Sequence, residues 1–181
     1  MYNVDPPSFP SFIDHEHLHL STVLLPFTAG MRITNGPYGA LSSPDDSTGE
    51  VHAVSRKELA ANQFHESVNW ILQRQSEVGT LLFAELIQQY AQWRSLVMDF
   101  LADDEASEEV PEISDAHDLF PLCGISALHV GEIRGEVGPS FSFEIGCAWD
   151  EEHGIGVRFD GLEVVAVGQA TEALAVSEGR A

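Results

Sequence analysis

Apolar side chains recur every three or four residues through the middle of the chain, starting at Val68. Polar side chains occupy most positions between them, so the spacing predicts an amphipathic helix that extends to about Leu101. Ser55 and Glu58 precede this stretch in an S-x-x-E pattern, which is typical of a capping box at a helix start. We therefore expect one long helix after a shorter helical entry, with Gly79 as the place for a kink. The predicted buried stripe consists of Val68, Ile71, Gln75, Val78, Leu82, Leu86, Tyr90, Trp93 and Val97.

A period of two residues replaces this pattern in the last third of the chain. In the segment SFSFEIG, phenylalanine and isoleucine alternate with polar or small residues, which predicts a strand with one solvated face. Glycines separate several such runs, and turns this short require antiparallel pairing, because parallel neighbours need long crossovers. Asp160-Gly161 is typical of a two-residue hairpin turn, and a further strand is predicted near 21–28. The C-terminal strands are expected at 125–133, 139–149, 155–159 and 163–168, followed by a short helix or tail.

The order of these elements predicts an α+β fold. An antiparallel β-sheet, built from N-terminal strands and the C-terminal meander, is expected to pack against one long central helix. Prolines at positions 6, 7 and 10 oppose regular structure, so residues 1–20 are predicted to be a flexible arm that contains histidines. Residues 21–181 are the predicted single domain, and a hydrophobic content of 44% suits one core. The segment near 102–118 carries eight carboxylates and no Lys or Arg, which favours a solvated acidic connector.

The chain is strongly acidic, with 8 Lys and Arg residues against 29 Asp and Glu and a formal net charge of −21. Nucleic acid and anionic membranes bind clusters of Lys and Arg, so we expect neither as a partner. The charge could attract a basic protein, but solubility alone explains it, and by itself the charge favours that simpler interpretation. No apolar run approaches the ~20 residues of a membrane span, and residues 1–20 lack the features of a secretory signal. We expect a cytoplasmic protein in which Cys123 and Cys147 are buried thiols, with a bridge as the alternative.

The segment IDHEHLHL contains H-E-x-x-H, the pattern in which zinc proteases place two histidines one turn apart on a helix. Prolines precede the motif closely and a strand-like run follows it, so only a short and marginal helix would fit. We therefore do not expect protease chemistry. In an extended chain the alternating histidines would share one side and could bind zinc, nickel or copper, whereas the alternative is an exposed, solvated arm. The candidate metal ligands are His15, His17 and His19.

A second cluster of titratable residues lies in CAWDEEHGIGV, between two predicted strands. Asp150, Glu152 and His153 could hold a metal ion or perform acid–base chemistry. In the structural alternative, which we favour, Trp149 packs inward, Asp150 caps the turn and His153 bonds a neighbouring carboxylate. No nucleophile or cofactor-binding motif accompanies the cluster, so we expect no catalytic residues and no cofactor.

This corner also resembles the motif W-D-x-E-H-G-x-G-V, which closes a bacterial family of uncharacterised proteins. The LLPF strand and the long helix ending near YAQWRSLV are similar to the layout of that family, over roughly Ser21 to Ala173. Such small acidic proteins are associated with toxin–immunity loci, so the resemblance implies a protein that blocks a cognate toxin by binding it. The matching positions are Trp149, Asp150, Glu152, His153, Gly154, Gly156, Val157 and Gly168.

Acidity and resemblance together lead us to expect an immunity-type binding protein and not an enzyme. An acidic face would occlude a cognate toxin, expected to be basic, such as a nuclease. The alternatives are a metal-dependent enzyme built on the Asp150, Glu152 and His153 corner, and a structural domain without a fixed partner. The candidate partner-binding residues are Asp103, Asp104, Glu105, Glu108, Glu109, Glu112, Glu151 and Glu152. The corner set, with a structural or a functional role, is Trp149, Asp150, Glu152, His153, Gly154 and Gly156.

Overall fold

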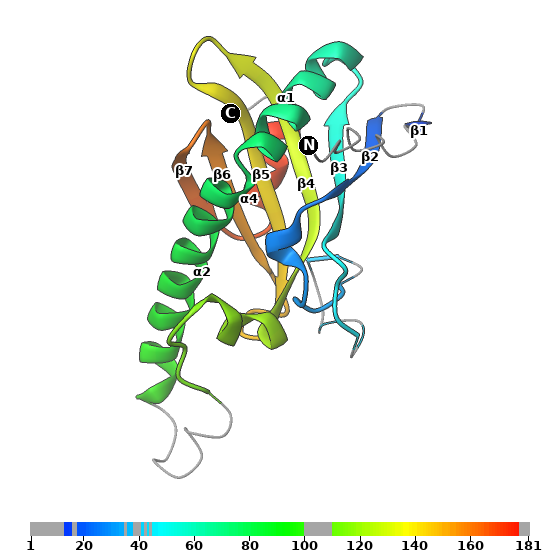
Figure 1. Cartoon of the computed structure of the whole chain (residues 1–181). Coiled ribbons are helices and arrows are strands. Elements are labelled where there is room, and N and C mark those ends of the chain that lie inside the picture. Colours follow the sequence, from blue (N-terminus) through cyan, green and yellow to red (C-terminus); the bar gives the residue numbers. More distant parts are fainter. Residues whose placement is uncertain are drawn as a thin grey trace, which may run out of the picture.

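A seven-stranded β-sheet forms the centre of the molecule, with its strands in the same order as in the chain (Figure 1). The strands are β1 (Ile13–His15), β2 (Leu18–Leu24), β3 (Glu50–Arg56), β4 (Cys123–Arg134), β5 (Gly138–Cys147), β6 (Ile155–Asp160) and β7 (Glu163–Gly168). The computed structural model describes residues 13–15, 18–34, 36–37, 41, 43, 45–99 and 110–177.

Neighbouring strands pair antiparallel, except for β3 and β4, which run parallel. The exception follows from the connection between them, because a long helical segment separates the two strands in the chain and allows a crossover. The helical elements are η1 (Pro26–Thr28), α1 (Ala61–Gln73), α2 (Gln75–Met98), η2 (Ala116–Leu122) and α4 (Thr171–Ser177). The predicted α+β class and mainly antiparallel sheet are therefore confirmed.

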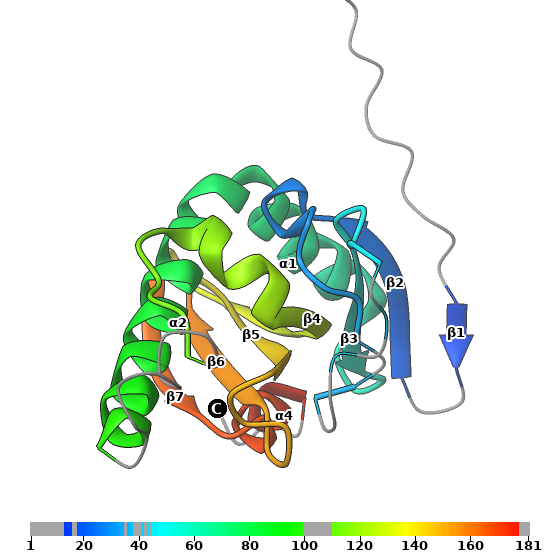
Figure 2. The same ribbon diagram turned by 90° about the horizontal axis from the view of Figure 1, so that it is seen from below.

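The predicted apolar stripe lies on α1 and α2, which cover one face of the sheet, here called the first face (Figures 1 and 2). Ile71 of α1 and Val78, Leu82 and Leu86 of α2 are fully buried, as the spacing predicted. The stripe therefore forms the helical side of the core. In the described part of the chain, no helix is both long and apolar enough to cross a membrane.

The helical stretch is two helices rather than one. Arg74 separates them, because its backbone leaves the helical region at φ −116° and ψ 17°. The guanidinium of Arg74 lies over the Trp70 ring, 4.4 Å from its centroid, which holds the break in place. Gly79 has a different role from the expected kink, since a Cβ there would lie 2.8 Å from Cγ of Phe27. The glycine lets α2 pack closely on η1.

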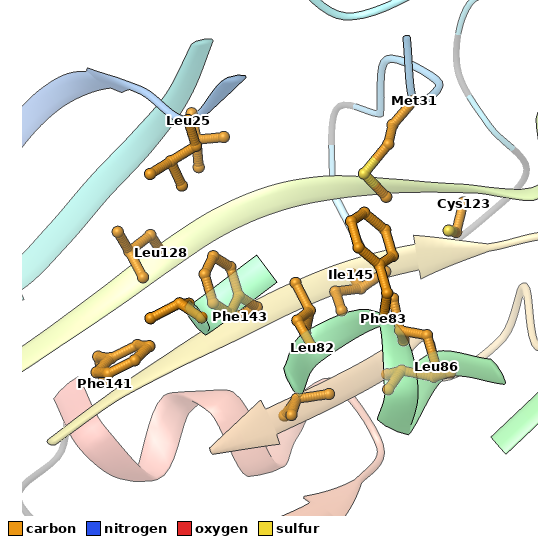
Figure 3. Close-up of a cluster of buried hydrophobic side chains, with 14 of the residues drawn as sticks. Leu25, Met31, Leu82, Phe83, Leu86, Cys123, Leu128, Phe141, Phe143 and Ile145 are labelled. Carbon is orange, nitrogen blue, oxygen red and sulfur yellow. The ribbon is translucent and has the colours of Figure 1, made fainter. Parts of the chain in front are cut away.

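The core lies between the first face and these helices. Figure 3 shows Phe141, Phe143 and Ile145 of β5 in one cluster with Leu82 and Leu86 of α2. All five side chains are fully buried. The apolar residues of the alternating segment SFSFEIG therefore point into this core.

The opposite side of the sheet, here called the second face, is covered by α4 (Figure 2). Ser142 of β5 is fully buried there, and its Oγ donates a hydrogen bond of 2.7 Å to the carbonyl of Ala173. The prediction of a solvated face is wrong at this position. Gly156 of β6 explains how α4 comes so close, since a Cβ there would lie 2.7 Å from both Ala173 N and Gln169 O. A glycine at this strand position leaves room for the backbone of α4.

The structure differs from the prediction upstream of α1. Residues Glu50–Arg56 form β3, which pairs along its whole length with β2. Ser55 is a buried residue of this strand, so the predicted capping box with Glu58 is wrong. α1 begins only at Ala61 and has no side-chain cap. Strand pairing along all seven residues outweighs the local helix-start pattern.

Two predicted boundaries are also shifted. β2 begins at Leu18, so the expected limit of the arm at residue 20 falls inside a strand of the sheet. In the β6–β7 hairpin, the two loop residues are Gly161 and Leu162, because Asp160 is already paired with Glu163. Gly161 has φ +59°, the left-handed conformation that this turn needs at its first position.

Candidate functional site

The W-D-x-E-H-G motif forms a tight corner between β5 and β6. Oδ1 of Asp150 accepts a hydrogen bond from the backbone N of His153 (3.2 Å) and lies 2.9 Å from His153 Nδ1. Trp149 is 8% exposed and meets Tyr90 of α2 edge to face, with 5.2 Å between ring centroids. These three corner residues therefore have the structural roles that we favoured from the sequence.

The corner and the end of β5 pack closely against an N-terminal segment, because two glycines there have no side chains. Gly154 has φ +61°, and a Cβ there would lie 2.5 Å from Pro37 O and 2.6 Å from Ile145 O. A Cβ on Gly146 would lie 2.8 Å from Oγ1 of Thr34. Any side chain at either glycine would push the segment off the corner.

The corner meets the described end of the acidic connector. The hydroxyl of Tyr90 donates a hydrogen bond of 2.7 Å to Pro111 O, while its ring holds Trp149. The backbone N of Ala148 donates to Leu122 O at 2.8 Å, which joins the corner to the end of η2. Figure 1 shows that η2 and the β5–β6 loop both lie at the lower end of the sheet. We call this region the acidic end; its exposed carboxylates are Glu112, Asp115, Asp118, Glu151 and Glu152.

An exposed apolar side chain lies in the segment that contacts the acidic end. Ile33 is 38% exposed and belongs to the N-terminal segment that packs against these two glycines. The preceding residue, Arg32, donates its backbone N–H to Phe120 O of η2 at 3.1 Å, and the following residue, Thr34, packs on Gly146. Ile33 therefore belongs to a segment that contacts the end of η2 on one side and β5, next to the corner, on the other.

Two arginines come near the acidic end, and both are engaged within the chain. Arg32 Nη1 lies 3.5 Å from Oδ1 of Asp46, and Arg94 Nε donates a hydrogen bond of 3.3 Å to Val110 O. Neither guanidinium pairs with a carboxylate of the acidic end through these contacts. Arg94 bonds a neutral carbonyl and keeps its charge, so the field of this surface combines that charge with those of its carboxylates.

The structure places only part of the predicted partner-binding set. Glu112, Glu151 and Glu152 are exposed; Glu112 follows Pro111, which Tyr90 binds, and Glu151 and Glu152 lie in the corner. The other five residues lie outside the described part of the chain; they are Asp103, Asp104, Glu105, Glu108 and Glu109.

The H-E-x-x-H segment is not helical, because His15 lies in β1 and His19 in β2, on two antiparallel strands. The zinc-protease geometry is therefore not formed, as we expected. The chain also reverses within the motif, so the proposed row of three histidines on one extended strand is wrong. The His19 ring is buried, with Nε2 2.8 Å from Leu59 O and its centroid 6.0 Å from that of Phe64. His17 lies outside the described residues, as does the side chain of His15.

The second face carries a polar cluster that sequence reasoning missed. His129 Nε2 lies 2.7 Å from Oε2 of Glu144, and the hydroxyl of Ser126 donates to Oε1 of Glu144 at 2.9 Å. A β-bulge between Ile125 and Ala127 inserts Ser126 into β4 opposite β5. The cluster therefore depends on strand register and on the bulge, and neither can be predicted from a local sequence pattern.

The electrostatics of the cluster favour a charged Glu144. Burial acts to raise the pKa of this carboxyl, but the hydrogen bond and charge of His129 and the hydrogen bond from Ser126 outweigh burial and lower it. The serine donates to the carboxylate rather than to the imidazole. This order differs from the serine–histidine–carboxylate relay that activates a nucleophile, so the cluster serves as an anchor between β4 and β5.

A protein-family model matches residues 46–174, from the loop before β3 into α4. The chain belongs to the DUF6985 family. That family is described as a domain of unknown function, which agrees with the expected resemblance to uncharacterised proteins. The matched range includes the corner, η2 and the Ser126–His129–Glu144 cluster, whereas Ile33 and β2 precede it. No curated protein and no solved structure matches the chain.

Metal chemistry at the corner stays a hypothesis. His153 is paired with Asp150 inside the turn, and Glu152 is exposed beside them. Among the residues that the structure describes, no three His, Cys, Asp or Glu side chains form a group that could hold a metal ion.

Proposed function

We propose that this protein is an immunity-type binding protein, which neutralises a basic protein toxin by docking on it and occluding its active surface. The observation that carries the proposal is the composition of the acidic end, whose exposed carboxylates accompany an exposed Ile33 in the segment bound to the end of η2. An apolar anchor inside a charged rim is typical of protein–protein binding surfaces.

The charge of the chain supports the same class of partner. A net charge of −21 attracts a basic protein over long range and raises the association rate. Ile33 would then enter an apolar pocket of the partner, and its burial would slow dissociation. A nuclease suits this description, because its active cleft must be positive to bind phosphate. The carboxylates of the acidic end would compete with the nucleic acid for that cleft.

The partner can be sought directly with the full chain. The immobilised protein is incubated with a lysate of the source organism at low salt, eluted with a salt gradient and analysed by mass spectrometry. We expect one stoichiometric basic protein that salt releases. The purified partner is then assayed for toxicity and for enzymatic activity, with and without the chain, and inhibition at equimolar concentration is expected.

Paired charge reversals test which surface binds. We expect the double variant Glu151→Lys/Glu152→Lys to bind the purified partner at least about tenfold more weakly, with a shallower dependence on salt. The matched control is Glu132→Lys/Glu136→Lys, which makes the same change in net charge at exposed sites of the β4–β5 hairpin. Equal losses in the two variants would mean that only net charge matters, and no loss in either would refute docking through the acidic end.

The apolar anchor has a separate signature. Replacing Ile33 by Ala should raise the dissociation rate and leave the association rate nearly unchanged, because the substitution removes contact area without changing charge. An unchanged dissociation rate would remove Ile33 from the proposed surface.

A further inference from the structure

Cys123 and Cys147 lie directly opposite each other at the start of β4 and the end of β5. The backbone N of Ala148 donates to the carbonyl of Leu122, and this bond connects the residue after one cysteine to the residue before the other. That arrangement identifies the cysteines as a non-hydrogen-bonded pair of the antiparallel ladder. The Cα atoms of such pairs approach to about 4.5 Å, which is within the range that disulfides span.

Both thiols point into the same region of the core. Residues opposite each other on paired strands share a face of the sheet, and both cysteines are free and fully buried. Sγ of Cys123 lies 3.3 Å from Leu119 O of η2, whereas Sγ of Cys147 lies 3.9 Å from Asp150 O of the corner. Each thiol therefore contacts one half of the acidic end.

Burial makes both thiols unreactive while the acidic end is closed. Desolvation, with a contribution from the neighbouring Cys147, raises the pKa of Cys123 far above its usual value. Desolvation likewise raises the pKa of Cys147, to about 12. Because the thiolate is the form that attacks a disulfide, exchange from the closed structure must be slow.

We propose that Cys123 and Cys147 are a modification site, which forms an intrachain disulfide by exchange with a small-molecule disulfide when η2 or the corner opens. One cysteine attacks the small disulfide and releases one small thiol, leaving a mixed disulfide. The second cysteine then attacks the protein sulfur of that mixed disulfide and releases the other small thiol. The two thiol protons leave with the two released thiols, and the small disulfide is the species that is reduced.

The bridge joins the two strands where η2 and the corner are attached. Once formed, it restricts separation of the start of β4 from the end of β5 and removes conformations from the unfolded chain. Oxidation therefore stabilises the acidic end against opening. This inference rests on the strand register and on the burial of both thiols, and it holds whether or not the protein binds a toxin.

The test treats the full chain with oxidised glutathione, first in buffer and then in urea below the unfolding midpoint. Intact mass and non-reducing peptide mapping are the readouts. We expect the loss of two hydrogen atoms, a linked pair of peptides containing Cys123 and Cys147, and faster formation as urea promotes opening. The single variants Cys123→Ser and Cys147→Ser should instead stop at one glutathione adduct.

The melting temperature supplies a second readout. The oxidised protein should melt several degrees higher than the reduced protein, and the double variant Cys123→Ala/Cys147→Ala should show no shift after the same treatment. Two stable glutathione adducts, bridges between chains, or thiols that stay reduced in urea would overturn the proposal. Equally fast oxidation with and without urea would overturn the requirement for opening.

Discussion

The two faces of the β-sheet hold their helices by different means. On the first face, Phe141 and Phe159 stack with 4.8 Å between centroids and 3° between ring planes, and Phe143 meets both rings edge to face. This layer buries large apolar area against α1 and α2. On the second face, α4 lies on serine and glycine, close enough for its backbone to receive a hydrogen bond from Ser142.

The difference shows what each face requires of its residues. The first face depends on volume, so several large side chains contribute to the same contact and a loss is costly but local. The second face depends on close approach, so single added atoms matter more than the apolar area that α4 can bury. The first face is thus stabilised by large side chains, and the second face by residues small enough to let α4 come close.

The largest expected effect comes from emptying the first face. Phe143→Ala removes a fully buried ring and should lower the free energy of unfolding by about 3–5 kcal/mol. Urea unfolding followed by tryptophan fluorescence measures this change. Leu162→Ala is the control at a partly exposed turn position, where we expect less than about 0.5 kcal/mol. Comparable losses at both sites would contradict a volume-dependent first face.

A smaller effect is expected from filling the second face. Gly156→Ala adds a Cβ at 2.7 Å from Ala173 N of α4 and from Gln169 O just before it, and should cost about 1–3 kcal/mol, with faster amide exchange in α4. Gly168 is paired with Gly156 in the sheet, but a Cβ there would meet only the Glu172 side chain, with Cβ at 3.6 Å and Cγ at 3.9 Å. Gly168→Ala is therefore the matched control and should be nearly neutral. If the two substitutions cost the same, close approach of α4 is not what holds the second face.

The polar anchor of the second face should appear in the dependence of stability on pH. The pKa of Glu144 is lowered in the folded state from its usual value of 4.5. Its contribution is therefore present above pH 4.5 and is lost as pH falls through the folded pKa. Glu144→Gln should lower stability by about 1–2 kcal/mol at neutral pH and flatten this acid limb.

Glu132→Gln supplies the comparison for that pH profile. Glu132 belongs to the same sheet but is exposed, so its substitution should leave both the stability and the acid limb close to those of the unmodified protein. If stability falls at acid pH in Glu144→Gln as it does in the unmodified protein, other carboxylates cause the acid unfolding.

The smallest effect is expected at the margin of α4. Nη1 of Arg158 lies 3.2 Å from Oε1 of Glu172, and both side chains are partly exposed. Water and salt screen such a pair, so Glu172→Gln should cost no more than about 1 kcal/mol, and less at high salt. A thermal melt at two salt concentrations measures it. A loss as large as that of Gly156→Ala would mean that charge, rather than close approach, anchors α4.

Much of the first face could be predicted from the sequence because its signals are local. The spacing of Val78, Leu82 and Leu86 specifies a helix face, and the alternation in β5 specifies which side chains point inward. The corner was also predictable, since Asp150 and His153 interact within a single turn. In these cases the partners are close in the chain.

The second face could not be predicted in this way, because its contacts join distant residues. Nothing near Ser142 indicates that α4 will cover it, and the pairing of Ser126 with Glu144 depends on a bulge. β3 was missed for a related reason: Ser55 and Glu58 match a helix start, yet pairing with β2 makes Ser55 a strand residue. The surroundings of Ile33 could not be predicted either, since they arise from contacts of its segment with η2 and with the two glycines near the corner.

The parallel junction of β3 and β4 divides the sheet into parts that differ in how fast they can assemble. Ala53 pairs with Leu128 and Val54 with His129, and more of the chain lies between these two strands than between any other pair of neighbouring strands. Hairpins close quickly, but this seam must bring together residues on either side of α1, α2 and η2, which costs more loop entropy. The meander from β4 to β7 is thus expected to form early. The parallel pairing of β4 with β3 is expected to form last and to limit the folding rate.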